Sequence, residues 1–141
     1  MTGRPAAAAL GYGLATFAAG FLFGSLRLLL LAPKVGTVPA ALIEVPLMLG
    51  ASWLLCDWAV SRFAVAPTLP DRVAMGALAF IILMACEFAA GFLLFGIGPG
   101  EQLRAMASPA GRIGLVAQLG FAAIPALWLT REERRGGRGR D

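Results

Sequence analysis

Three charged side chains and one amide lie inside long apolar stretches of this sequence: Arg27, Glu44, Glu87 and Gln118. A charge within the hydrocarbon layer of a membrane costs about 2.5–3.5 kcal/mol on insertion scales, so it is retained where it pairs with another group or takes part in transport. One cation and two carboxylates can form an ion pair and leave one acid that can exchange a proton. We therefore expect these four residues to form a polar or binding site, and we expect any activity to depend on Glu87, the deepest acid.

Three of these residues also have a purely structural interpretation. Arg27 lies near the end of its apolar run and could extend its charged head to the interface, although helical side chains lean toward the N-terminus, which here means back into the membrane. Glu87 lies too deep for a short carboxylate to reach water. Its structural alternative is a neutral acid that hydrogen-bonds between helices. Gln118 is best explained as an amide that hydrogen-bonds to a neighbouring helix.

Several kinds of chemistry are excluded by the residue types of the chain. Histidine is absent, which removes the commonest metal ligand and general base. Cys56 and Cys86 stand alone inside apolar runs, so they indicate neither a disulfide framework nor a CxxC metal site. The sequence shows no nucleophile–base pair and no phosphate-binding loop. It therefore predicts no metal site and no cofactor, and it disfavours an enzyme.

The composition places the chain in a membrane. Of its 141 residues, 59% are hydrophobic and 14% are charged, whereas soluble domains are about half apolar and a quarter charged. The formal charge of +4 could indicate a nucleic-acid partner. The arginines, however, flank the apolar runs and crowd the C-terminus, which membrane topology explains better. We expect the protein to be surrounded by the lipid bilayer and to bind no nucleic acid.

Four apolar runs predict transmembrane helices, since about 20 residues cross the hydrocarbon layer. The fold class that follows is all-α, an integral membrane four-helix bundle in a single domain at 1–130, with a disordered basic cytoplasmic tail at 131–141. The predicted spans are residues 6–31, 39–60, 73–95 and 113–129. A turn containing proline and glycine separates the first two spans. The longest loop, 96–112, contains a short amphipathic piece.

Small residues indicate which helix faces pack closely. Gly20 and Gly24 match the GxxxG pattern and share one helical face with Arg27. Gly91 lies on the same face of the third span as Glu87. These patterns predict that both charged residues face other helices rather than lipid.

The distribution of basic residues predicts the orientation. With both termini in the cytoplasm, eight basic residues lie inside and three outside, in agreement with the excess of Lys and Arg in cytoplasmic segments. The inner set is Arg4, Arg62, Arg72, Arg131, Arg134, Arg135, Arg138 and Arg140, and the outer set is Lys34, Arg104 and Arg112. The predicted location is the cell inner membrane, as a multi-pass protein.

The same orientation predicts how deep the polar residues lie. Arg27, Glu44 and Glu87 are placed roughly 6, 7 and 12 Å below the outer boundary at the helical rise of 1.5 Å per residue. They therefore converge in the outer half of the bundle. Because Arg27 and Glu44 agree best in depth and belong to a short hairpin, we expect Glu44 to be the closer partner of Arg27.

These features favour a small membrane protein without catalytic activity. The first hypothesis is an accessory or assembly subunit, whose buried Arg/Glu network fixes helix packing and whose small-residue faces bind partner membrane helices or a second copy of the chain. The alternative is a small proton-coupled transporter or carrier that uses Glu87 with Arg27 and Glu44. An intramembrane enzyme is the weaker alternative, because no catalytic motif supports it.

Overall fold

The computed structural model describes residues 3–137, and every regular element in that range is helical. The elements are α1 (Gly3–Leu26), η1 (Arg27–Leu31, a π-helical turn), α2 (Ala32–Val35), α3 (Thr37–Phe63), α4 (Leu69–Phe95), α5 (Pro99–Ala107) and α6 (Pro109–Gly137). Four segments are long and apolar enough to cross a membrane: Arg4–Val35, Thr37–Phe63, Leu69–Phe95 and Pro109–Gly136. The prediction of an all-α protein with four candidate spans is confirmed.

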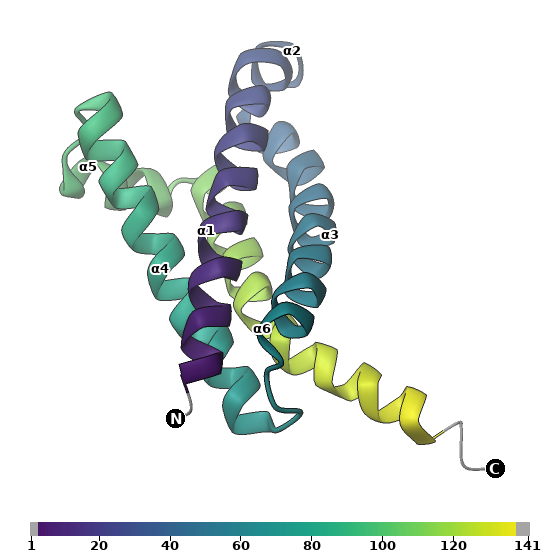
Figure 1. The fold of residues 1–141 in the computed structure, drawn as a ribbon. Helices are drawn as coiled ribbons and strands as arrows, with labels where there is room; N and C mark the ends of the chain where they lie inside the picture. Colours follow the sequence, from purple (N-terminus) through teal and green to yellow (C-terminus); the bar gives the residue numbers. More distant parts are fainter. Residues whose placement is uncertain (1–2, 138–141) are drawn as a thin grey trace.

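The four long helices form a bundle in which α1 and α6 each pack against both α3 and α4 (Figure 1). The helices α3 and α4, which are consecutive in the chain, are therefore separated by α1 on one side and by α6 on the other. Both ends of the described chain lie at one end of the bundle, and α2 and α5 lie at the opposite end. An even number of crossings requires this arrangement of the termini.

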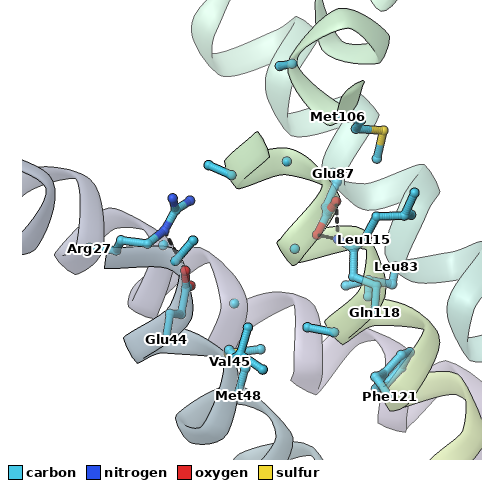
Figure 2. Close-up of a pocket in the computed structure, with 18 of the residues that line it drawn as sticks. Arg27, Glu44, Val45, Met48, Leu83, Glu87, Met106, Leu115, Gln118 and Phe121 are labelled. Atoms are coloured by element: carbon cyan, nitrogen blue, oxygen red, sulfur yellow. Dashed lines mark hydrogen bonds and ion pairs between the residues drawn. The ribbon is translucent and has the colours of Figure 1, made fainter. Parts of the chain in front are cut away.

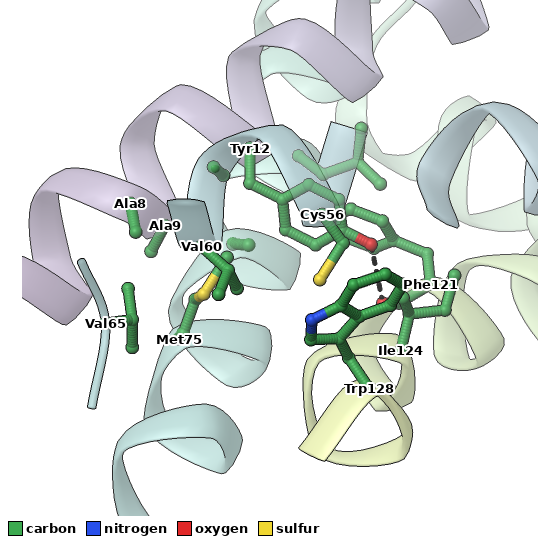
Figure 3. Close-up of a cluster of buried hydrophobic side chains, with 13 residues drawn as sticks. Ala8, Ala9, Tyr12, Cys56, Val60, Val65, Met75, Phe121, Ile124 and Trp128 are labelled. Atoms are coloured by element: carbon green, nitrogen blue, oxygen red, sulfur yellow. Dashed lines mark hydrogen bonds between the residues drawn. The ribbon is translucent and has the colours of Figure 1, made fainter. Parts of the chain in front are cut away.

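The tightly packed core lies toward the end that holds both termini. The hydroxyl of Tyr12 in α1 donates a hydrogen bond of 3.1 Å to the carbonyl oxygen of Phe121 in α6, and the two rings are 4.4 Å apart (Figure 3). Trp53 and Trp128 meet edge to face at 5.1 Å, with the Arg131 guanidinium over both rings. By contrast, no residue of η1, α2 or α5 is buried. Packing is therefore tight at one end of the bundle and loose at the other.

The reversals between helices follow from local sequence chemistry. Gly36 separates α2 from α3 with a φ of +90°, which a residue with a side chain rarely adopts. Thr68 caps the N-terminus of α4, where its hydroxyl accepts from the amide of Asp71. Gly96 ends α4 in the left-handed conformation, with a φ of +66°. These residues determine where α2 and α4 end and where α3 and α4 begin.

The first helical segment is longer than the sequence predicts. The expected end was residue 31, but the helix passes through η1 and α2 and stops only at Gly36. Within η1, the amide of Ala32 donates to the carbonyl of Arg27, five residues earlier. A π turn of this kind lets the chain continue in helical form into Pro33, which has no amide hydrogen of its own.

The last helix also departs from the prediction. The expected disordered tail at 131–141 is helical as far as Gly137, and positions 138–141 lie outside the described residues. The contacts of Arg131 with two tryptophan rings and an ion pair of Glu132 tie the first residues of this extension to the bundle, and the end of α6 projects away from the other helices (Figure 1). The expected amphipathic piece in the loop 96–112 is the short helix α5.

Candidate polar site

A cavity of about 490 Å³ lies among α1, α3, α4, α5 and α6, between the packed core and the loosely packed end (Figure 2). Its wall extends from Thr16 and Phe121, beside the core, to Arg27 and Ser108 at the other end. Volumes of about 300–1,000 Å³ are usual for pockets that hold small molecules. The cavity is large enough for a ligand of that class.

The ion pair of Arg27 with Glu44 joins the end of the first helical segment to α3. The Arg27 Nε lies 2.5 Å from the Glu44 Oε2, and the two side chains are 22% and 17% exposed. The contact is an ion pair by distance, and the Arg27 Nε has no hydrogen-bond partner among the described residues. Arg27 opens the π turn η1, and such turns often occur at functional positions. The expected pairing of Arg27 with Glu44 is confirmed.

The second pair joins α4 to α6. The amide nitrogen of Gln118 donates to both carboxylate oxygens of Glu87, at 2.7 and 2.8 Å. The expectation that Gln118 bonds across helices is therefore confirmed, with Glu87 as its partner. The amide oxygen of Gln118 is buried and has no hydrogen-bond partner among the described residues. A buried acceptor without a partner costs about 1–3 kcal/mol, so this amide is held in place at a cost in stability.

Both pairs line the same cavity, as Figure 2 shows. Arg27, Glu44 and Glu87 therefore line one cavity, as expected, although the hydrogen-bond partner of Glu87 is Gln118 and not Arg27. These three are the charged residues among those that line the cavity. One cation against two carboxylates leaves one negative charge when both acids are ionised.

Comparisons with known protein families, with curated proteins and with solved structures find no match for this chain. The site must be interpreted from its own chemistry. Within residues 3–137, no group of three or more His, Cys, Asp or Glu side chains could hold a metal ion. What the geometry offers is an ion pair, an acid held by an amide, and apolar walls.

The three glycines expected at helix contacts all lie against other helices of this chain. A Cβ added to Gly20 would lie 3.4 Å from Met48, and one added to Gly24 would lie 3.8 Å from Glu44. At Gly91 the added Cβ would come within 2.6 Å of the Gln102 amide of α5. The GxxxG face therefore packs on α3 and lines the cavity rather than standing free for a partner protein.

Sequence reasoning missed the role of Thr16 in the cavity wall. This side chain is 1% exposed, it lines the cavity, and its hydroxyl has no partner among the described residues. Thr16 lies four residues before Gly20, on the face that also carries Gly24 and Arg27. The helical spacing was the available signal, because it puts the hydroxyl on the same face as the charged residue.

Arg72 was also missed as a buried residue. It is 1% exposed at the end that holds the termini, and its guanidinium donates to the carbonyls of Val65 and Ala66 and, at 2.8 Å, to Glu132. The sequence placed this arginine only among the basic residues of the cytoplasmic side. The actual partner lies 60 residues away in the expected tail, so no local pattern could indicate it.

Proposed function

We propose that this protein is a small proton-coupled carrier of the cell inner membrane, in which Glu87 is the residue that binds and releases the proton. The proposal depends on one observation: the Arg27–Glu44 pair and the Glu87–Gln118 pair line the same cavity, where two carboxylates face a single cation. A bundle stabilised only by polar pairs has no need of an open cavity beside them. A carrier needs such a space next to a group that changes its charge.

Gln118 is suited to hold Glu87 in either protonation state. In the observed arrangement its amide nitrogen donates to both oxygens of the carboxylate. When Glu87 is protonated, its O–H becomes a hydrogen-bond donor, and the amide oxygen of Gln118, which has no partner, can accept that hydrogen bond after the amide rotates. The Arg27–Glu44 pair is neutral as a unit and keeps the first helical segment against α3 while Glu87 changes charge.

We further propose that both termini are cytoplasmic, which puts the cavity in the outer half of the bundle. The excess of basic residues in the segments on the side of the termini supports this orientation. Cysteines introduced at Lys34 and at Arg134 in a cysteine-free background test it with an impermeant maleimide. Labelling from the outside is expected at position 34 only, and labelling at 134 would refute the orientation.

The carrier role is tested by charge movement after a pH step. Proteoliposomes on a solid-supported membrane are expected to give a transient current with the wild type, because protons reach an acid inside the bundle. Glu87→Gln keeps the shape of the side chain and is expected to abolish the current. Glu101→Gln, at an exposed position of α5, is the matched control and should leave it unchanged. A current that persists in Glu87→Gln, or is absent from the wild type, would overturn the proposal.

The accessory or assembly role is the second candidate. It is favoured by the fact that each polar pair ties one helix to another, the first joining η1 to α3 and the second joining α4 to α6. A partner membrane protein or a second copy of the chain would then bind on the outer faces of the bundle. Purification in mild detergent with mass spectrometry tests this role. A stoichiometric partner together with no pH-step current would favour it over the carrier.

A further inference from the structure

A second cavity reaches Glu87 from the side of the bundle. It has a volume of about 230 Å³ and lies between the first helical segment and α4. It shares Gly20, Gly24, Leu28 and Glu87 with the main cavity. Glu87 therefore lies in the wall between the interior of the bundle and a groove on its surface.

Aromatic rings form much of the wall of this groove. Phe21 and Phe95 are stacked with their centroids 6.4 Å apart, and Phe17 lies 6.2 Å from Phe21. Phe21 is 43% exposed and Phe95 is 63% exposed, so in a membrane their rings face the lipid. The faces of aromatic rings carry negative charge density and attract cations.

The charges at the two cavities favour a cation over an anion. The charged residues that line either cavity are Arg27 from η1, Glu44 from α3 and Glu87 from α4, while α5 and α6 contribute none. Arg27 is already paired with Glu44. The carboxylate that remains without a cationic partner is Glu87, which is held by the amide of Gln118.

We propose that the site takes a lipophilic organic cation, which enters from the bilayer between the first helical segment and α4 and exchanges for the proton of Glu87. The proposal rests on the carrier function given above and names its substrate class. Binding releases one proton: the neutral acid plus the free cation gives the carboxylate–cation pair plus H⁺, with one positive charge on each side. Because the groove is lined by glycine and phenylalanine, the ligand meets aromatic faces before it meets the carboxylate.

Tetraphenylphosphonium is the probe, and tetraphenylborate is its control, with nearly the same shape and the opposite charge. In weakly buffered detergent solution, the wild type is expected to bind tetraphenylphosphonium and release about one proton for each cation. Binding should weaken as the pH falls, since protons compete for Glu87. Tetraphenylborate should not bind. Binding of the borate as tight as that of the phosphonium would show recognition of shape alone and overturn the proposal.

Two sets of variants locate the binding site. Glu87→Gln should weaken tetraphenylphosphonium binding at least tenfold and remove the proton release, while Glu101→Gln should match the wild type. Phe21→Leu should weaken binding about two- to fivefold, the effect of losing one cation–π contact. Phe92→Leu, on an exposed position of α4 outside both cavities, is the control for this change.

The outcomes separate the two proposals. Unchanged phosphonium binding in Glu87→Gln would place the ligand elsewhere and overturn the inference. A wild-type protein that gives the pH-step current but does not bind the phosphonium would retain the carrier function and refute the cationic substrate. Thermal denaturation of each variant in the same detergent confirms that it is folded, so a loss of binding is attributable to the site.

Discussion

Breaking the ion pair of Arg27 with Glu44 should destabilise the protein more than removing both residues together. The two charges are 2.5 Å apart and about four-fifths covered, and the removal of either one leaves the other without its counter-charge. Deleting one partner of a fully buried pair costs about 3–5 kcal/mol. Because both side chains line a cavity that water can enter, the expected loss is smaller, about 2–3 kcal/mol for Arg27→Leu or Glu44→Leu alone.

The double variant Arg27→Leu with Glu44→Leu removes both charges and restores apolar volume. Replacement of a buried pair by hydrophobic residues is often neutral or stabilising, so its free energy of unfolding should be within about 1 kcal/mol of the wild type. The coupling energy of the double-mutant cycle should then reach about 2 kcal/mol or more, near the upper part of the range for residues in contact.

The measurement is reversible unfolding of the purified protein in mixed micelles, followed by circular dichroism as the denaturing detergent is increased. Arg104→Leu, at an exposed position of α5, controls for the loss of a positive charge and should change the free energy by less than about 0.5 kcal/mol. If the double variant loses as much stability as the two single variants combined, Arg27 and Glu44 stabilise the protein independently. The interpretation of the pair would then be wrong.

Three further predictions test the packing of the helices by the same measurement. Gly76→Ala should lower the free energy of unfolding by more than about 3 kcal/mol, because the added Cβ would lie 2.0 Å from a backbone oxygen of α6. Gly114→Ala is its control: the added Cβ meets nothing within 4 Å, so the free energy of unfolding should rise by up to about 1 kcal/mol. Equal effects of the two changes would contradict the close approach of α4 and α6. Tyr12→Phe should cost about 1 kcal/mol for its hydrogen bond, and no loss would show that the bond contributes nothing. Arg72→Met should destabilise the protein far more than Glu132→Gln, since the arginine side chain is 1% exposed and the glutamate side chain 40% exposed. A larger loss for Glu132→Gln would show that the buried Arg72 is not the residue on which this contact depends.

The spans could be predicted because apolar length alone determines them. The sequence prediction failed at two places, for different physical reasons. At Pro33 a proline was interpreted as the start of a turn, but the π turn before it lets the helix continue to Val35. At residues 131–137 a charged, glycine-rich composition indicated disorder, but α6 continues through them, and Arg131 and Glu132 connect its first residues there to Trp53, Trp128 and Arg72.

The polar site was partly predictable for a geometric reason. The pairing of Arg27 with Glu44 follows from depth, since two residues close to the same turn must lie at similar heights. The pairing of Glu87 with Gln118 needs the knowledge that α4 and α6 are neighbours, and sequence periodicity does not give the order of helices around a bundle. The hydroxyl of Thr16 could have been placed by helical spacing, but its lack of a partner is visible only in three dimensions.

The unequal packing of the two ends has a consequence for the proposed carrier. At the end that holds the termini, α6 is fixed to each of the other long helices: to α1 by the Tyr12 hydrogen bond, to α4 by Arg72, and to α3 by the contact of its own Arg131 with Trp53. At the opposite end the cavity separates the helices, and α6 is held across it by Gln118. If Glu87 exchanges its proton with both sides of the membrane, the contacts at the packed end must be released in turn. The half of α6 that begins at Phe121 takes part in all three of them, so it is the element whose movement would open that end.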